Sequence, residues 1–333
     1  MARIGLLLWV ALLAFALPEV FAGTGAGWLT RPDVYVLALP LYALHFILLC
    51  HLAVKTRRTG WTSLYLLGIV FGLYETWVTK VVWSGYPNES GFAMGGFGPW
   101  FGVHETIGLL LFYHAVTSFL LPIAVLSRLF PSFGAAFPIP DWIFGKGRWA
   151  FGRRLGLALI WGLISGHNMP DVGIYLASWL PMLLLLVLGY LWLRPAAKAD
   201  PTLGRWSLWL SVIWLAAIYI ISYKYLRVEE IPPDPALAIT AGFYLVLGLL
   251  YWLQPRRETE THTALESPGN MPLRWLLVVF LIGLMTSAAI SAGVGLAMEF
   301  AAVPFLMMLV LGVGLFVWLV LWRGLIRRPN SVV

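Results

Sequence analysis

The class of fold follows from one apolar stretch of the chain, VPFLMMLVLGVGLFVWLVLWRGL, at residues 303–325. The stretch is almost entirely apolar, and its only charged residue, Arg323, stands near its end. About 20 such residues are enough for one helix to cross the hydrocarbon core of a bilayer. The stretch therefore predicts a transmembrane helix.

The rest of the chain has the same character. Of its 333 residues, 60% are hydrophobic and 11% are charged, whereas roughly 25% are charged in an ordinary soluble domain. A soluble fold of this length cannot bury so much apolar surface, because a folded monomer hides only about three quarters of what its chain exposes. The composition excludes a soluble globular protein and predicts an all-α, polytopic integral membrane helix bundle.

We identify ten apolar runs as membrane spans and expect them to form a single transmembrane domain over residues 1–333. The first run also has the positive start and apolar core of a secretory signal. Because Pro18 and Glu19 interrupt it just before the small residues typical of cleavage, we expect it to remain as a span. The runs are 4–22, 33–54, 61–83, 104–129, 153–170, 173–193, 205–225, 235–254, 273–297 and 303–325.

The basic residues predict the orientation of these spans. With ten spans, all but four of the 22 Lys and Arg residues fall on the side that holds both termini. Because cytoplasmic ends of spans carry the excess of Lys and Arg, we expect both termini in the cytoplasm and the protein in the plasma or cytoplasmic membrane. The net charge of +7 then reflects contact with lipid head groups, so the expected partner is the lipid bilayer and not nucleic acid. The other side holds Arg31, Lys80, Lys224 and Arg227.

Three connections between spans are expected to be distinctive. The external loop 84–103 is rich in glycine and aromatic residues, and it could fold back over the outer face. The cytoplasmic segment 131–154 mixes aromatic rings with cations, which is typical of a segment in the membrane interface. Residues 256–270 form the longest polar stretch and are expected to be a cytoplasmic loop.

Polar residues inside the spans are the candidates for function, because an ionisable group there costs roughly 2.5–3.5 kcal/mol on insertion scales. Glu75 lies in the third run, and Gly68 and Gly72 precede it by seven and three residues. This spacing places all three on one helical face. Small residues four apart mark a face that packs closely against another helix, so Glu75 is expected to point into the protein rather than into lipid.

Histidines of the next two runs extend this set. His104 begins the fourth run at the outer interface, and His114 lies near the middle of that run. His167 ends the fifth run, behind the small-residue pair Gly162 and Gly166. Because consecutive spans are usually neighbours, we expect spans three to five to build one outward-facing polar pocket. The candidate catalytic residues are Glu75, His104, His114 and His167, and the candidate substrate-pocket residues are Lys80, Glu105, Asn168 and Asp171.

Structural roles remain open for several of these residues. His45 and His51 are more typical of hydrogen-bonding struts between helices, and Lys80 of a side chain that extends to the outer interface. Glu75 and His114 are as compatible with helix packing as with function. Metal binding is left undecided: the acidic, histidine-rich outer side favours a metal, a proton path or a cationic ligand, the single cysteine, Cys50, excludes a thiolate cluster, and the histidine spacing does not select a haem. The sequence therefore names no cofactor.

Three short motifs follow one another between residues 75 and 171. They are Glu75-Thr76-Trp77-Val78-Thr79-Lys80, Trp100-Phe101-Gly102-Val103-His104 and His167-Asn168-Met169-Pro170-Asp171. In order and spacing they resemble the Glu-Glu-x-x-x-Arg, Phe-x-x-x-His and His-x-x-x-Asn motifs of the CAAX-protease and bacteriocin-processing family of glutamate intramembrane peptidases. The chain departs from that pattern at Thr76, Lys80, Trp100 and Asp171, and the resemblance covers only these residues of the chain. It implies that Glu75 activates a water while His104 and His167 stabilise the oxyanion.

Three classes of function follow from these observations, and the clustering of the polar residues on neighbouring spans favours the first. The first is an intramembrane hydrolase with Glu75 as general base. The second is a proton-coupled transporter of small solutes in which Glu75 and His114 titrate. The third is a non-catalytic scaffold subunit in which the polar residues only fix helix packing. The substrate is not predicted by any of the three.

Overall fold

The computed structural model describes residues 2–85, 96–97, 101–137, 144, 149–193, 202–256 and 271–326, and it is helical almost throughout these ranges. Seven of the described helices are long and apolar enough to cross a membrane, by length and composition. They confirm the prediction of an all-α, multi-pass membrane protein. These helices are Val34–Lys55, Glu105–Leu129, Val172–Leu193, Arg205–Tyr225, Asp234–Trp252, Pro272–Ser291 and Val303–Ile326.

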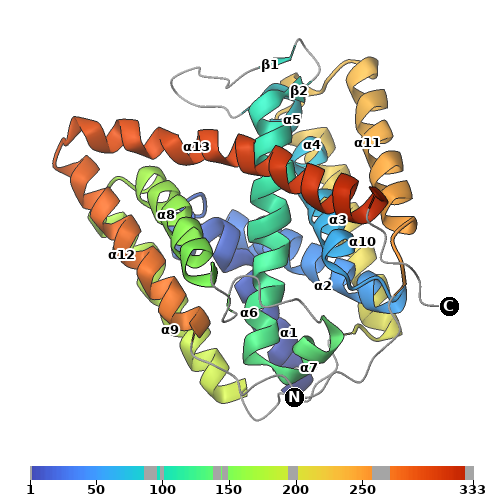
Figure 1. Ribbon diagram of the computed structural model, residues 1–333, viewed down its shortest axis with the longest axis horizontal. Coiled ribbons are helices and arrows are strands. Elements are labelled where there is room, and N and C mark those ends of the chain that lie inside the picture. The colour runs from blue at the N-terminus through green and yellow to red at the C-terminus, as the bar shows by residue number, and fades with distance from the viewer. Residues whose placement is uncertain are drawn as a thin grey trace. The chain divides into compact units, whose positions relative to one another are not determined.

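Figure 1 labels the α-helices in chain order. They are α1 (Ala2–Phe15), α2 (Leu39–Lys55), α3 (Trp61–Gly72), α4 (Tyr74–Trp77), α5 (Val81–Ser84), α6 (Leu121–Leu129), α7 (Pro131–Ala136), α8 (Ala150–Asn168), α9 (Val172–Leu193), α10 (Arg205–Tyr225), α11 (Asp234–Trp252), α12 (Met271–Ser291) and α13 (Gly295–Leu315). The wider π-helical segments that adjoin α1, α2, α6 and α13 are η1 (Ala16–Val20), η3 (Val34–Ala38), η4 (Glu105–Leu120) and η7 (Phe316–Ile326). Two short 3₁₀ turns are η2 (Trp28–Thr30) and η6 (Val228–Glu230).

Three of the ten predicted runs do not appear among the helices of spanning length. Run 4–22 gives the shorter apolar helix Gly5–Val20. Run 153–170 gives α8, which is one continuous helix but is not among the seven. Run 61–83 is divided into α3, α4 and α5. For these three runs, the predicted count of ten spans rests on the apolar pattern of the sequence.

The division of run 61–83 lies next to the predicted site. α3 ends at Gly72, and the backbone reverses its handedness at Lys80, where φ is 58°. A left-handed residue cannot continue a right-handed helix, and the β-branched Val78 and Thr79 before it are weak helix formers. The expectation of one continuous helix is wrong here, because an apolar pattern reports the length of a run and not breaks in its backbone.

The chain forms two compact units. Unit 1 comprises Met1–Ile47, Leu121–Thr202 and Thr259–Met307, and unit 2 comprises Leu48–Leu120, Leu203–Glu258 and Met308–Val333. Whether residues 1–333 act as a single transmembrane domain stays a prediction.

In unit 1, α8 packs along α12 (Figure 1). Gly162 and Gly166 permit this approach: a Cβ on Gly166 would lie 2.5 Å from the Gly283 carbonyl oxygen, and one on Gly162 would lie 2.6 Å from the Ile282 side chain. Neither separation is possible for real atoms. The predicted close packing of these two glycines is confirmed.

In unit 2, α3 packs against η4, and α11 and η7 also contact α3. A Cβ on Gly68 would lie 2.8 Å from both the Cα and the carbonyl oxygen of Ala115. Thr62 adds a hydrogen bond at the other end of α3, from its hydroxyl to the Leu319 carbonyl oxygen at 3.0 Å. The glycine face predicted from the sequence is therefore the face of α3 that meets η4.

The three predicted connections are described only in part. Within loop 84–103, β1 (Gly96–Phe97) pairs antiparallel with β2 (Phe101–Gly102), with Gly96 opposite Gly102. Within segment 131–154, α7 follows α6. The remainder lies outside the described residues: 86–95 and 98–100 of the first loop, 138–143 and 145–148 of the second segment, and 257–270 of the polar loop 256–270.

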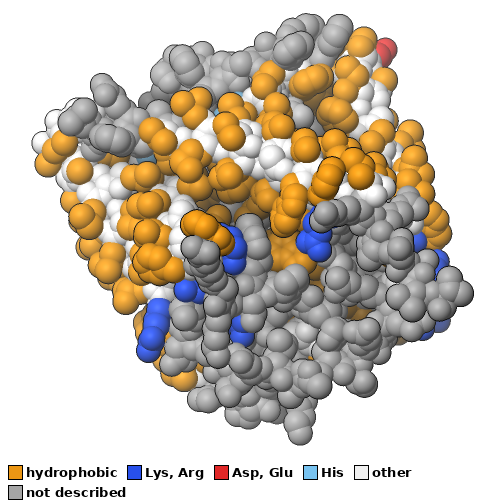
Figure 2. Space-filling view, viewed as in Figure 1, with side chains coloured by type: hydrophobic (Ala, Val, Ile, Leu, Met, Phe, Trp, Pro, Cys, Tyr) orange, Lys and Arg blue, Asp and Glu red, His pale blue; other side chains and the backbone are white. Residues whose placement is uncertain are grey.

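Large apolar side chains lie exposed on the candidate spans. On α12, Leu277, Leu281 and Met285 are exposed, Met285 over 73% of its surface. Figure 2 shows apolar side chains over the visible faces of α12 and α13. A soluble monomer rarely tolerates such faces, whereas lipid chains solvate them, so the surface agrees with a protein that is integral to a membrane.

Candidate functional site

Glu75 and His114 meet inside unit 2. The Glu75 Oε1 lies 3.3 Å from the His114 Nε2, and the two side chains are exposed over only 7% and 2% of their surface. An ionisable pair this deeply buried must share its charge or a proton, because an unpaired charge away from water is strongly unfavourable. The structure therefore brings together two of the four candidate catalytic residues, which we call the Glu75–His114 pair.

The glycines of α3 explain why this pair can form. Glu75 lies in α4, which begins just after α3 ends at Gly72. A Cβ on Gly72 would lie 2.9 Å from the His114 Cβ, so a larger residue would push the histidine away. Together with Gly68 one turn earlier, this glycine sets a short distance between α3 and η4 at the level of the pair.

Hydroxyl groups hold both members of the pair. Thr79 Oγ1 donates a hydrogen bond to Glu75 Oε2 and also lies 3.0 Å from the Glu75 carbonyl oxygen. Ser118 Oγ lies 2.9 Å from His114 Nδ1. In the neutral tautomer with a proton on Nε2, Nδ1 accepts from Ser118, and in the imidazolium both ring nitrogens donate. Both protonation states of His114 are thus compatible with the surrounding hydrogen bonds.

Aromatic rings enclose the histidine. Tyr74 and Tyr113 approach His114 edge-on, each with a centroid distance of 5.2 Å, and Phe71 stacks on it at 6.2 Å. Ring walls exclude water and lower the local dielectric constant, which strengthens the attraction between a carboxylate and an imidazolium. The enclosure favours a pair whose net charge is zero.

From the sequence, Lys80 was expected to extend to the outer interface. In the structure it is completely buried. Its ammonium donates to the carbonyl oxygen of Ser222 at 3.1 Å and to that of Leu226. The last carbonyl groups of a helix have no partner within it, and a cation is favourable at that end. Lys80 therefore binds the carboxyl end of α10.

Arg227 makes the reciprocal contact from the connection after α10. Its guanidinium donates to the carbonyl oxygens of Thr79 at 2.7 Å and Gly85 at 2.9 Å, and it is also paired with Glu230. Because the hydroxyl of the same Thr79 donates to Glu75, Arg227 holds the residue that orients the Glu75 carboxylate. The sequence contained no motif for this role; the single signal was that Arg227 is one of four basic residues on the predicted outer side.

His104 and Glu105 lie where the chain enters η4, and both are buried. Two glycines make room for them. A Cβ on Gly108 would lie 3.2 Å from the His104 Nε2, and a side chain at Gly102 would overlap the Glu105 carboxylate. The two residues thus belong to the same unit and the same helical stretch as His114.

The remaining candidates belong to unit 1. Asn168 Nδ2 donates to the Ala22 carbonyl oxygen at 2.9 Å. Asp171 Oδ1 accepts from the Ile174 N–H at 2.8 Å, which caps the start of α9. The His167 ring packs edge-on against Phe305 with centroids 5.9 Å apart. Within unit 1 these three residues have contacts that stabilise the fold.

The two histidines expected as struts both make backbone contacts. His51 Nδ1 accepts from the Leu203 N–H at 3.0 Å, which joins α2 to the residues before α10. His45 Nδ1 lies 2.8 Å from the Leu41 carbonyl oxygen in its own helix. His51 thus connects two segments of unit 2, as expected of a strut.

A metal is poorly matched to the pair. Among the residues that the structure describes, no group of three His, Cys, Asp or Glu side chains is placed to hold one ion. Zinc sites take three or four such ligands, whereas the pair supplies one carboxylate and one imidazole, and the polar groups that hold it are hydroxyls. The described side chains suit a proton better than a metal ion.

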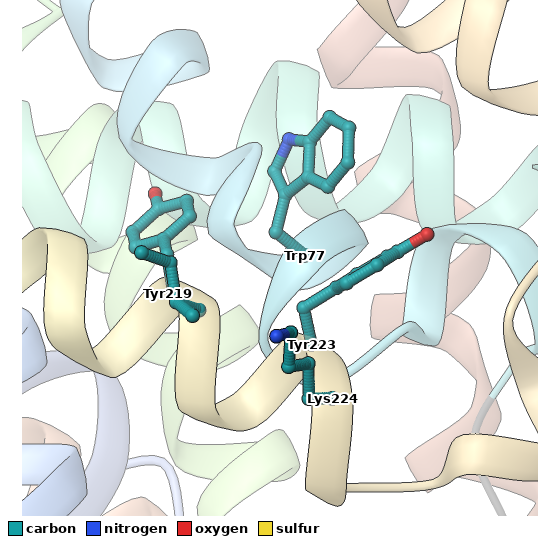
Figure 3. Close-up of a pocket in the computed structure, with 5 residues that line it drawn as sticks. Trp77, Tyr219, Tyr223 and Lys224 are labelled. Carbon is teal, nitrogen blue, oxygen red and sulfur yellow. The ribbon is translucent and has the colours of Figure 1, made fainter.

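A hollow lies beside α4 that was not predicted from the sequence, and we call it the aromatic hollow. Its volume is about 250 Å³, and Figure 3 shows Trp77 of α4 between Tyr219 and Tyr223 of α10. The signal was present in the sequence, because two tyrosines four residues apart share one helical face. Its lining residues are Trp77, Tyr219, Ile220, Tyr223 and Lys224.

Apolar helices with an ionisable pair buried between two of them define a multi-pass membrane protein with an internal acid–histidine site. The chain belongs to an uncharacterized membrane protein family, whose model matches residues 6–328. This is not the CAAX-protease and bacteriocin-processing family that residues 75–171 resemble.

One curated relative comes from Archaeoglobus fulgidus and is described as an uncharacterized protein. It is 33% identical over 93 residues, which are 28% of this chain and 28% of that protein. The matched part is therefore much less than two thirds of the relative's length. No solved structure matches the chain.

Proposed function

We propose that this protein is a proton-coupled membrane transporter in which the Glu75–His114 pair binds the coupling proton. The observation that carries the proposal is the buried contact between Glu75 Oε1 and His114 Nε2 at 3.3 Å. Ionisable residues inside spans mark ion and proton pathways, and histidine is the side chain that changes its charge near neutral pH. A pair of this kind can hold one proton and release it when its surroundings change.

The division of run 61–83 supports the same proposal. Breaks on both sides of α4 flank Glu75, one at Leu73 and one at Lys80. Transporters place substrate and coupling-ion sites where membrane helices are discontinuous, because free backbone groups and helix ends reach the site there. Irregular backbone at membrane depth is tolerated only where protein or a water-filled cavity surrounds it, and Lys80 and Arg227 supply such partners here.

The resemblance of residues 75–171 favours intramembrane hydrolysis, but that reaction needs a contact that the Glu75 carboxylate does not show. A general base needs a carboxylate oxygen directed at the attacking water. In this structure Oε1 faces His114 and Oε2 accepts from Thr79. Proton exchange within the pair uses these same contacts, so transport accounts for them more directly than hydrolysis does.

The orientation predicted from the basic residues belongs to this proposal. With ten spans and both termini in the cytoplasm, the pair lies in the outer half of the membrane. A polar pocket there would receive protons and solute from outside. A small solute is the expected cargo.

Proton binding is tested without knowledge of the cargo. Infrared difference spectra of the purified protein would be recorded across about pH 5 to 8, the range in which histidine changes charge. We expect a carboxylate band that shifts across this range as the pair exchanges its proton and that disappears in Glu75→Gln. The matched control is Glu229→Gln, an exposed carboxylate in the connection after α10, which should leave this band in place.

Coupling is tested in proteoliposomes that enclose a pH-sensitive dye, with a potassium gradient and valinomycin making the interior negative. Pools of amino acids, organic acids and sugars are added outside in turn. We expect one pool to acidify the interior of wild-type vesicles and no pool to do so with Glu75→Gln or His114→Gln. A pair that keeps one protonation state throughout, or Glu75-dependent hydrolysis of a peptide or phospholipid in detergent without solute-driven acidification, would overturn the proposal.

A further inference from the structure

The aromatic hollow is separate from the hydrogen bonds of the Glu75–His114 pair. It lies between α4 and α10, both in unit 2. α10 is a candidate span whose large apolar side chains are mostly exposed, and Ile220 on the rim of the hollow is exposed over 59% of its surface. The hollow therefore opens onto an apolar face of a candidate membrane span, which lipid chains solvate better than water does.

Packed rings keep the hollow open. Trp77 lies 5.7 Å from Tyr223 and 5.3 Å, edge-on, from Trp83, measured between ring centroids. Trp83 is itself fixed by a hydrogen bond from its Nε1 to the Thr240 hydroxyl at 2.9 Å. These contacts hold the lining rings in place. An empty hollow would therefore leave the ring atoms on its walls without dispersion contacts. A lipid chain can restore them.

The rim of the hollow carries a positive charge. Lys224 stands in the last turn of α10, where a membrane span reaches the level of the lipid head groups. Its side chain is exposed, and among the described residues it has no acidic partner, whereas Arg227 is paired with Glu230. Buried Lys80 adds a second cation on the ring of Tyr223, with 5.5 Å between Nζ and the ring centroid. Lys224 therefore offers the rim an unpaired positive charge that an anionic group can neutralise.

We infer that the aromatic hollow binds a membrane lipid with an anionic head group. One acyl chain fills the space between Trp77, Tyr219 and Tyr223, and the head group pairs with the Lys224 ammonium. The apolar lining selects an amphiphile over a soluble anion, and the unpaired cation selects an acidic head group over a zwitterionic one.

The test is native mass spectrometry of the full-length protein in detergent, titrated with dioleoylphosphatidylglycerol and, separately, with dioleoylphosphatidylcholine. We expect the first lipid to bind about fivefold more tightly, the ratio that follows from about 1 kcal/mol per basic residue near the surface. Lys224→Gln should remove the preference and Lys224→Arg should keep it. Trp77→Ala should weaken the binding of both lipids.

Trp209→Ala is the matched control, because Trp209 is an exposed aromatic residue on α10 that does not line the hollow. The inference is overturned if the preference survives Lys224→Gln, if Trp209→Ala weakens binding as much as Trp77→Ala, or if inorganic phosphate displaces the lipid at equal concentration. Glu75→Gln should leave lipid binding unchanged, so failure of the transport proposal and failure of this one can be told apart.

Discussion

At the scale of the residue, Glu75 and His114 each depend on the other. Both are buried, and the partners of the Glu75 carboxylate include the histidine ring and the Thr79 hydroxyl. Removing one member of a buried ion pair leaves an uncompensated charge, whereas removing both can be nearly neutral. The pair is therefore a stability element as well as a candidate proton site, and the two roles need separate measurements.

This dependence predicts a specific pattern of stabilities. His114→Ala should lower the free energy of unfolding by about 3–5 kcal/mol, because it leaves the Glu75 carboxylate unpaired. Adding Glu75→Gln to that variant should recover part of the loss, because the buried charge is then gone. Unfolding in detergent, followed by circular dichroism, measures both variants. Losses that simply add in the double variant would contradict a paired carboxylate.

At the scale of the element, two glycines of α3 decide how near η4 can come. The sequence predicted this face from the spacing of Gly68, Gly72 and Glu75, and the structure confirms its contact with η4. The break at Lys80 was not predictable in the same way. It depends on the left-handed backbone of Lys80 and on carbonyl contacts with Lys80 and Arg227. Partners more than 140 residues apart in the chain leave no local pattern.

Gly68→Ala should destabilise the protein by about 1–3 kcal/mol, as overpacking does in other cores. Its Cβ would lie 2.8 Å from the backbone of Ala115, which cannot move aside as a side chain can. The matched control is Gly242→Ala in α11, where no atom lies within 4 Å of the added Cβ; there alanine should be neutral or stabilise the helix by up to about 1 kcal/mol. Equal effects of the two substitutions on unfolding in detergent would show that α3 and η4 are not in close contact.

At the scale of the whole molecule, the number of crossings decides where the termini lie. Ten spans return the carboxyl end of the chain to the side of its amino end, whereas an odd number separates the two. The seven helices of spanning length would, by themselves, give an odd number. The distribution of Lys and Arg favours ten spans with both termini in the cytoplasm.

Reporter fusions test this orientation. Green fluorescent protein attached to either terminus should fluoresce, because both ends are expected in the cytoplasm, and alkaline phosphatase inserted in the connection Val228–Glu230 should be active outside. A control fusion of alkaline phosphatase to the carboxyl end should be inactive. Opposite results at the two termini would require an odd number of crossings and would remove at least one of the runs 4–22, 61–83 and 153–170 from the spans.

The amino-acid pattern alone was enough to predict the membrane class, the all-α fold, the close-packing glycines and the candidates Glu75 and His114. These features are local: composition, apolar length and helical spacing are properties of neighbouring residues. Four other features became visible in the folded chain: Glu75 meets His114, Thr79 and Arg227 orient the carboxylate, Lys80 is buried at the end of α10, and run 61–83 is broken. Each of these depends on backbone and side chains brought together from distant parts of the chain, where the free energy of burying a polar group is settled by whichever partner the fold supplies.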